Sequence, residues 1–348
     1  MEYKGGDQDI LDTLLRKTVW CSNYKESSIL YSAVRISRNF IGFNYPDKMK
    51  KSEFQQVEDI VDNSLLNLKD REYVKIDLQY IDEIALIILK EKKIIPELKH
   101  SERSRVKLYI FDDLKTFILT NYNNHLSIVS YSSTKISKES KKEIDKIVDC
   151  FDNKIFQFDE NFGYLSNSIL FLGTGLKTYS AYILPYQREI NRLRSSISGF
   201  ESNGFVSVRA NQFGSDNEDI IITTNRDSFS FTPQQILNNH IMLDKELLKI
   251  EKDCKEKILN EKSRIDIIAD QTLKMMERDS LSYKSFMEIL FKLMILKDYG
   301  YKYLEVPKLK SYYYQFTRGG ISYKEGVKLS TLDCDKLRVS MLKSLLGR

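Results

Sequence analysis

The sequence has few of the residues that build metal centres and disulfide frameworks. Its 348 residues include three histidines, each of which stands alone, and four cysteines with no C-x-x-C pair: Cys21, Cys150, Cys254 and Cys334. A zinc ribbon, a redox dithiol and a histidine-built metal centre are therefore not expected. We expect reduced thiols and no protein-bound metal.

Long apolar runs and a strong excess of either charge are also absent. No uninterrupted apolar stretch reaches membrane-spanning length, and the polar amino terminus lacks the apolar core of a signal peptide. The 54 Lys and Arg residues against 49 Asp and Glu residues give a formal net charge of +5, which is too mild to indicate nucleic-acid binding. These features favour a soluble cytoplasmic protein that binds neither nucleic acid nor a membrane.

The first 240 residues show a mixed pattern. The 42% hydrophobic content is enough for a sizeable core. Short β-rich runs predict strands over Arg105–Ile110, Thr116–Thr120, His125–Tyr131, Gly204–Ala210 and Asp219–Thr224. Helical patterns alternate with them over Lys51–Leu66, Lys138–Cys150 and Tyr186–Ser198. This combination predicts an α+β fold in which helices flank an antiparallel sheet.

Beyond residue 240 the pattern is helical. Apolar residues recur at intervals of three, four or seven between Leu247 and Met275, which is typical of one or two amphipathic helices. Another helix is expected over Tyr283–Lys297, capped by Ser280 or Ser282 with Gly300 just past its end, and a last one over Leu329–Leu346. We therefore predict a division into an α/β domain, 1–240, and an all-helical C-terminal domain, 241–348.

Gly163, Gly173 and Gly175 frame the segment that ends at Lys177. A residue without Cβ can adopt positive φ and admit a close neighbour, so these glycines predict tight turns or close backbone approach. Taken alone, Gly-Thr-Gly is more often an ordinary loop than a functional site.

Four segments in order carry a more specific signature. Ser27–Asn39, with Gly42 and Tyr45-Pro46, is similar to "SSRVRLARN…GYPFP", and Asn121–Leu126 is similar to "NEEDHL". Phe158–Lys177 is similar to "FDEKLGYLTSCPTNLGTGLR", and Gly204–Asn225 to the segment with "VVRG…GE…ISN". By these motifs the chain resembles the phosphagen (ATP:guanido) kinase family, most closely its bacterial protein arginine kinases.

The resemblance implies several properties together. It implies a guanido-kinase catalytic domain that transfers the terminal phosphoryl group of Mg-ATP to arginine side chains of proteins. The segments Asn260–Asp266 and that following Leu281-Ser282 resemble the family's helical C-terminal domain, which implies a homodimer through these helices. Partner proteins in stress response and proteolysis are implied as well.

The positions that would bind and deprotonate the guanidinium group have lost their negative charge. The resemblance places Tyr122, Asn123 and Asn124 at three acidic positions, Ser168 at the reactive cysteine and Ser215 at a further glutamate. An amide or a hydroxyl cannot offset the charge of a guanidinium or take its proton at neutral pH. None of these residues is therefore expected to be catalytic.

The phosphate-binding positions are partly retained. The family surrounds the phosphates with about five arginines, because their forked donors match phosphate oxygens. Here the nucleotide-binding candidates are Arg35, Lys177 and Arg209, while Ala33 and Ser127 replace the other two arginines and Ile183 replaces a histidine. At roughly 1.5–3 kcal/mol for each charge-assisted hydrogen bond, two lost arginines weaken Mg-ATP binding by several powers of ten. A structural role for Arg35 and Arg209, anchoring a strand or a carboxylate, is an equal alternative.

Two functions remain open on the sequence. The favoured one is a pseudokinase, a degenerate protein-arginine-kinase-like protein that acts in regulation or as a scaffold. The alternative is a divergent active protein arginine kinase that draws its carboxylates from Asp159, Glu160, Asp216 or Glu218. His125 is expected to be a structural hydrogen-bonding residue in both.

Overall fold

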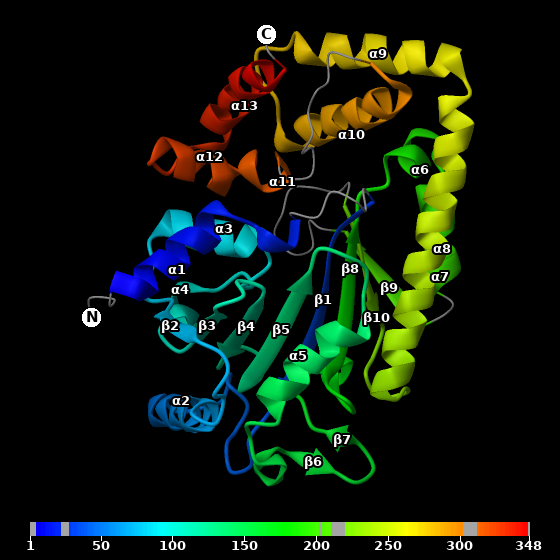
Figure 1. Ribbon diagram of the computed structural model, residues 1–348. Coiled ribbons are helices and arrows are strands. Elements are labelled where there is room, and N and C mark those ends of the chain that lie inside the picture. The colour runs from blue at the N-terminus through cyan, green and yellow to red at the C-terminus, as the bar shows by residue number, and fades with distance from the viewer. Residues whose placement is uncertain (1–4, 22–27, 202–203, 210–219, 302–311, 347–348) are drawn as a thin grey trace.

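An antiparallel sheet of eight strands forms the centre of the molecule (Figure 1). The computed structural model describes residues 5–21, 28–201, 204–209, 220–301 and 312–346. The strand order is β2-β3-β4-β5-β1-β8-β10-β9, and β6-β7 forms a separate two-stranded sheet. The strands are β1 (Ile29–Arg38), β2 (Tyr73–Asp77), β3 (Lys107–Phe111), β4 (Thr116–Thr120), β5 (Leu126–Ser132), β6 (Phe158–Asp159), β7 (Gly163–Tyr164), β8 (Leu176–Tyr182), β9 (Phe205–Arg209) and β10 (Ile221–Asn225).

Helices cover both faces of the large sheet. The α-helices are α1 (Gly5–Arg16), α2 (Lys51–Leu65), α3 (Glu83–Glu91), α4 (His100–Arg103), α5 (Lys138–Val148), α6 (Pro185–Glu189), α7 (Leu193–Glu201), α8 (Pro233–Leu259), α9 (Lys262–Met276), α10 (Tyr283–Tyr299), α11 (Tyr312–Gln315), α12 (Arg318–Glu325) and α13 (Thr331–Leu345). Three 3-10 turns are η1 (Val19–Cys21), η2 (Asn153–Ile155) and η3 (Ile169–Phe171). The α+β class with a helical C-terminal region is thus confirmed.

The alternation of side chains along β1 separates two cores. Val34 and Ile36 point to one face, where they pack in a cluster with α2, α5 and the start of α8. Tyr31 and Ala33 point to the opposite face, which is covered by α1, α3, α10, α11 and α13. The second cluster therefore joins the N-terminal helices, the sheet and the C-terminal helices in one buried core.

The C-terminal helices begin and end with the expected capping residues. Ser282 accepts a hydrogen bond from the backbone N–H of Ser285 at the start of α10, and Gly300 ends that helix with a φ of 101°. Helix α8 runs without interruption across residue 240. The division into two domains at this residue stays a prediction.

One predicted helix is wrong. Tyr186–Ser198 was expected to form a single helix, but the chain forms α6 and α7 with a break at Asn191, whose φ of 55° is left-handed. A helix cannot continue through a left-handed residue. At the other end of α6, the Glu251 carboxylate of α8 accepts hydrogen bonds from the backbone N–H groups of Tyr186 and Gln187 and thereby caps the start of this helix.

Candidate active site

The glycine-framed loop is held by close backbone contacts. Gly163, Gly173 and Gly175 have φ values of 72°, 96° and 65°. A Cβ on Gly163 would lie 2.7 Å from the carbonyl oxygen of Gly173, and one on Gly173 would lie 2.6 Å from that of Ser228. The expectation of positive φ and close approach is confirmed at all three glycines.

Arg38, at the end of β1, anchors this loop from inside. Its guanidinium lies 3.5 Å from the centroid of the Tyr164 ring and donates a hydrogen bond to the carbonyl oxygen of Thr174. Burial lowers the pKa of Arg38 to about 10. The residue stands in the first family-like motif, but the sequence did not single it out, because its partners Tyr164 and Thr174 are more than 100 positions away.

The loop between β4 and β5 is built around amides where carboxylates were expected. Asn124 is buried, and its side-chain oxygen accepts hydrogen bonds from the Asn39 amide (2.8 Å) and the Ser166 hydroxyl (2.9 Å). Asn39 in turn accepts a hydrogen bond from the backbone N–H of His125. Asn123, by contrast, is exposed. Asn124 thus links β1, this loop and the glycine-framed loop through neutral hydrogen bonds.

His125 has the structural role that was expected. Its Nδ1 accepts a hydrogen bond from the backbone N–H of Phe40, so its Nε2 carries the proton and donates to the carbonyl oxygen of Asn44. The ring stacks on Phe40 and meets Phe43 edge-on. Burial lowers the pKa of His125, which keeps the ring neutral.

Ser168 serves as a cap. Its hydroxyl accepts a hydrogen bond from the backbone N–H of Leu170 and begins the short turn η3. The side chain of Ile169 next to it is 77% exposed. Ser215 and the alternative carboxylates Asp216 and Glu218 lie outside the described residues.

Two carboxylates of the alternative hypothesis are described, Asp159 at the end of β6 and Glu160 in the turn that follows. Asp159 accepts hydrogen bonds from the backbone N–H groups of Asn161 and Phe162, and therefore shapes this turn. Glu160 is exposed.

Five of the positions that the resemblance assigns to the nucleotide lie on one face of the sheet. Arg35 in β1 is paired with Lys177 in β8 and with Val129 in β5. Directly opposed residues and residues two apart on a strand share a face, so Arg35, Lys177, Ala33 and Ser127 lie on the same side. Ile183, just past β8, is buried in the cluster on that side.

Lys177 is engaged within the protein. Its ammonium group donates hydrogen bonds to the carbonyl oxygens of Asn225 and, at 2.9 Å, Arg226. The residue is only 3% exposed. Burial lowers the pKa of Lys177 to about 8, although the Asp227 carboxylate acts in the opposite direction.

Arg35 is less constrained. It is partly exposed, and its guanidinium lies 5.8 Å from the centroid of the Tyr179 ring. Within the described part of the chain it forms no ion pair, and its buried Nε has no hydrogen-bond partner. The backbone of Arg209 pairs with Ile221 at the end of β9, while its side chain lies outside the description.

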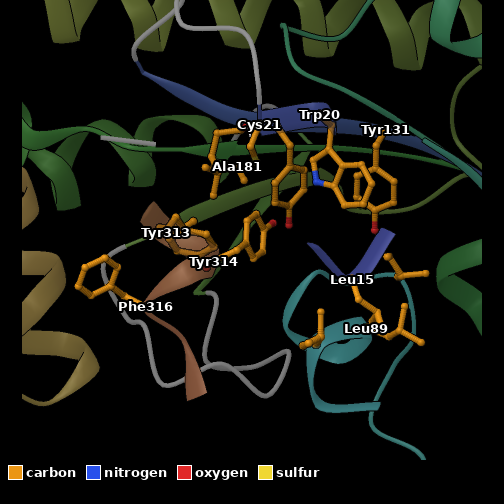
Figure 2. Close-up of a cluster of buried hydrophobic side chains, with 14 of the residues drawn as sticks. Leu15, Trp20, Cys21, Leu89, Tyr131, Ala181, Tyr313, Tyr314 and Phe316 are labelled. Carbon is orange, nitrogen blue, oxygen red and sulfur yellow. Dashed lines mark hydrogen bonds between the residues drawn. The ribbon is translucent and has the colours of Figure 1, made fainter. Parts of the chain in front are cut away.

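Aromatic side chains cover the end of this face beyond Arg35. Trp20 of η1 is fully buried and stacks on Tyr131 with 4.7 Å between the ring centroids. Tyr314 of α11 belongs to the same buried cluster as Ala33 and Ala181 (Figure 2). Because Ala33 is 2% and Ile183 is 0% exposed, these two positions, which the resemblance assigns to the nucleotide, are closed to solvent.

The lowered pKa of Lys177 predicts a pH-dependent stability. An unfolded lysine has a pKa of about 10.4, so between about pH 8 and pH 10 the unfolded chain binds more protons than the folded chain. The free energy of unfolding contributed by this residue therefore rises with pH in that window. Denaturant titrations at several pH values measure how the free energy of unfolding changes with pH. This change should be smaller in Lys177→Met than in the natural protein by up to about 1 kcal/mol per pH unit. Equal slopes in both proteins would contradict the shift.

Comparison with known protein families matches the middle of the chain, from within α2 to within α8. The model of the family described as "ATP:guanido phosphotransferase, C-terminal catalytic domain" matches residues 55–254. A protein-arginine kinase of Clostridium perfringens (strain 13 / Type A) is 25% identical over 301 residues, which cover 80% of this chain and 86% of that protein. A protein-arginine kinase of Exiguobacterium sp. is 22% identical over 344 residues, which cover 92% and 93%.

Solved structures with the same fold are phosphagen kinases. Lombricine kinase aligns with a TM-score of 0.54 and 14% identity, over 67% of this chain and 68% of that chain. The duplicated taurocyamine kinase from Schistosoma mansoni, with bound transition-state-analogue components, aligns with a TM-score of 0.53 and 15% identity, over 68% of this chain and 35% of that chain. At these identities the likeness shows the fold alone.

Proposed function

Since this chain belongs to the ATP:guanido phosphotransferase family, we propose that it is a protein-arginine-kinase-like pseudokinase that uses the retained fold as a regulatory or scaffold protein. The phosphotransfer site is degenerate at both its guanidinium end and its nucleotide end. Different contacts support the degeneracy of each end.

At the guanidinium end, neutral groups stand where the reaction needs a base. Asn124 is fixed by Asn39 and Ser166, and Ser168 caps a turn. The Asp159 carboxylate holds its own turn. Proton abstraction from a guanidinium group requires a carboxylate within hydrogen-bond reach, and loss of a positioned base costs about 10²–10⁴ in rate.

At the nucleotide end, the covered sheet face is the observation that carries the proposal. Trp20 and Tyr314 occupy the side of the sheet on which Ala33 and Ile183 lie. The ammonium group of Lys177 is already bound to two carbonyl oxygens, so it is not available to a phosphate. The described residues at this face do not fit Mg-ATP, and we therefore derive no catalytic step through it.

Nucleotide binding and phosphoryl transfer test the proposal together. A melting temperature measured with and without millimolar Mg-ATP should shift by less than about 1 °C, because a ligand stabilises a protein only when its concentration exceeds the dissociation constant. Incubation with labelled ATP and an arginine-rich protein should leave no acid-labile label above that of Arg209→Ala. An active protein-arginine kinase under the same conditions is the positive control.

One result would overturn the proposal, and another would limit it to one end of the site. Acid-labile arginine phosphorylation that is present in the natural protein and lost in Arg209→Ala would establish the alternative, a divergent active kinase. A melting shift of several degrees that is lost in Arg35→Ala, without phosphorylation, would limit the degeneracy to the guanidinium end.

The same proposal includes a homodimer formed through the C-terminal helices. It also includes partner proteins in stress response or proteolysis, and a location in the cytoplasm. Helix α9 exposes two aliphatic side chains, Ile267 (56%) and Leu273 (43%), which a second copy could cover. Sedimentation velocity decides the oligomeric state, and a monomer at all concentrations would contradict the dimer.

A further inference from the structure

A cavity lies between the N-terminal and the C-terminal helices, apart from the glycine-framed loop. Its volume is about 780 Å³, and its walls come from α1, η1, α3, α11, α12 and α13. This volume is typical of small-molecule binding sites. Leu15, Val19, Ile88 and Met341 contribute apolar walls.

The buried polar groups beside this cavity face each other. Tyr314 lines the cavity and is 6% exposed, and the indole N–H of Trp20, next to the lining residue Cys21, points to its hydroxyl group. Figure 2 shows Tyr314, Cys21 and Leu15 within one cluster. This part of the wall is therefore aromatic and apolar, and the Tyr314 hydroxyl does not select a ligand.

The charges of buried Lys92 and partly exposed Glu91, which also line the cavity, are bound by the protein itself. The ammonium group of Lys92 donates hydrogen bonds to the carbonyl oxygens of Leu15 (3.0 Å) and Lys17 (2.9 Å) at the end of α1. The Glu91 carboxylate accepts a hydrogen bond from the backbone N–H of Gly319 at the start of α12. These contacts form the walls and leave neither charge to select a ligand.

The exposed charges at the cavity are all basic. Arg16, Lys17 and Lys324 line it and are exposed. Arg16 approaches Asp12 at 4.0 Å and donates a hydrogen bond to the Tyr323 hydroxyl. Lys17 and Lys324 form no ion pair within the described part of the chain. The mouth of the cavity therefore attracts anions.

We propose that this cavity binds a small organic anion, a carboxylate with an apolar body. The apolar body would lie between Leu15, Ile88 and Met341, and the carboxylate would lie near Lys17 and Lys324. This proposal is independent of the degenerate kinase site, because none of the nucleotide positions with a described side chain lines the cavity.

The single tryptophan provides a direct probe. Trp20 is adjacent to Cys21 in the cavity wall, so titration with decanoate should change its fluorescence in a saturable way, with a dissociation constant below about 1 mM. Decanol and acetate, which each lack one half of the ligand, should bind at least about tenfold more weakly. Rising salt should weaken decanoate binding, because exposed charges are screened.

Variants locate the binding. Lys17→Ala/Lys324→Ala should weaken decanoate binding about tenfold, and Ile88→Phe, which fills the cavity, should abolish it. Lys336→Ala, an exposed lysine of α13 outside the cavity, is the matched control and should leave binding unchanged. The proposal is wrong if decanoate does not saturate below about 1 mM, if decanol binds equally well, or if the lysine and cavity-filling variants bind like the natural protein.

Discussion

Replacing Trp20 by alanine is expected to lower the free energy of unfolding by about 3–5 kcal/mol. The indole is fully buried, stacks on Tyr131 at 4.7 Å and meets Phe117 edge-on at 5.8 Å between ring centroids. It belongs to the core that joins the sheet to the N-terminal and C-terminal helices. The sheet, the N-terminal helices and the C-terminal helices all border the indole, and they cannot all move inward to fill the cavity that its removal leaves. The loss of free energy of unfolding should therefore be near the upper end of the range for a large-to-small substitution.

Denaturant unfolding followed by circular dichroism measures this effect, since the variant has no tryptophan left to report fluorescence. Tyr80→Ala is the matched control, because Tyr80 is 64% exposed and its loss should change the free energy of unfolding by less than about 0.5 kcal/mol. A loss of less than about 1 kcal/mol in Trp20→Ala would contradict the packing described for this face. Mg-ATP-dependent stabilisation that appears only in Trp20→Ala would show that the aromatic cover, rather than the lost arginines, prevents nucleotide binding.

Replacing Gly173 by alanine is expected to cost about 2–5 kcal/mol, through two separate effects. The φ of 96° is unfavourable for any residue with a Cβ. In addition, that Cβ would lie 2.6 Å from the carbonyl oxygen of Ser228 and 2.7 Å from the Cα of Phe229. Both contacts are to backbone atoms, so a side-chain rotation cannot relieve them. The glycine-framed loop and the β10–α8 connection would have to separate.

Two other glycines separate these effects. Gly42 has a φ of 86° but nothing within 4 Å of an added Cβ, so Gly42→Ala should cost only about 1–2 kcal/mol. Gly199 lies in α7, also with open space, and Gly199→Ala should stabilise the protein by about 0.5–1 kcal/mol. Urea titrations of the three variants provide the comparison. If Gly173→Ala costs no more than Gly42→Ala, the close approach to Ser228 does not constrain the fold.

Local patterns in the sequence predicted five of the described strands, β3, β4, β5, β9 and β10, while the neighbouring strands β1 and β8 inside the sheet were not among the expected ones. The β4 strand over Thr116–Thr120 and the cap of α10 at Ser282 follow from alternation and capping chemistry, which act between near neighbours. Strands β1 and β8 carry Ser, Thr, Arg and Lys at buried positions, because each has strand neighbours on both sides and helices on both faces. Their hydrophobic alternation is therefore weak.

At the candidate site, the sequence by itself determined which chemical groups are present. The family frame and the glycines that need positive φ are properties of residue types at positions in the chain. The same is true of Tyr122, Asn123 and Asn124 at the expected acidic positions and of Ser168 at the position of the reactive cysteine. These features can be recognised from the sequence without knowledge of any tertiary contact.

Only the tertiary structure decided what those groups touch. Asn124 became a hydrogen-bonding centre, the ammonium group of Lys177 was bound by two carbonyl oxygens, and Trp20 covered the sheet face that carries Arg35. The partners in these contacts lie 42 or more positions apart in the chain, so no local pattern encodes them. The strand register and the packing of helices from both ends of the chain bring them together, because burial of the apolar faces fixes both.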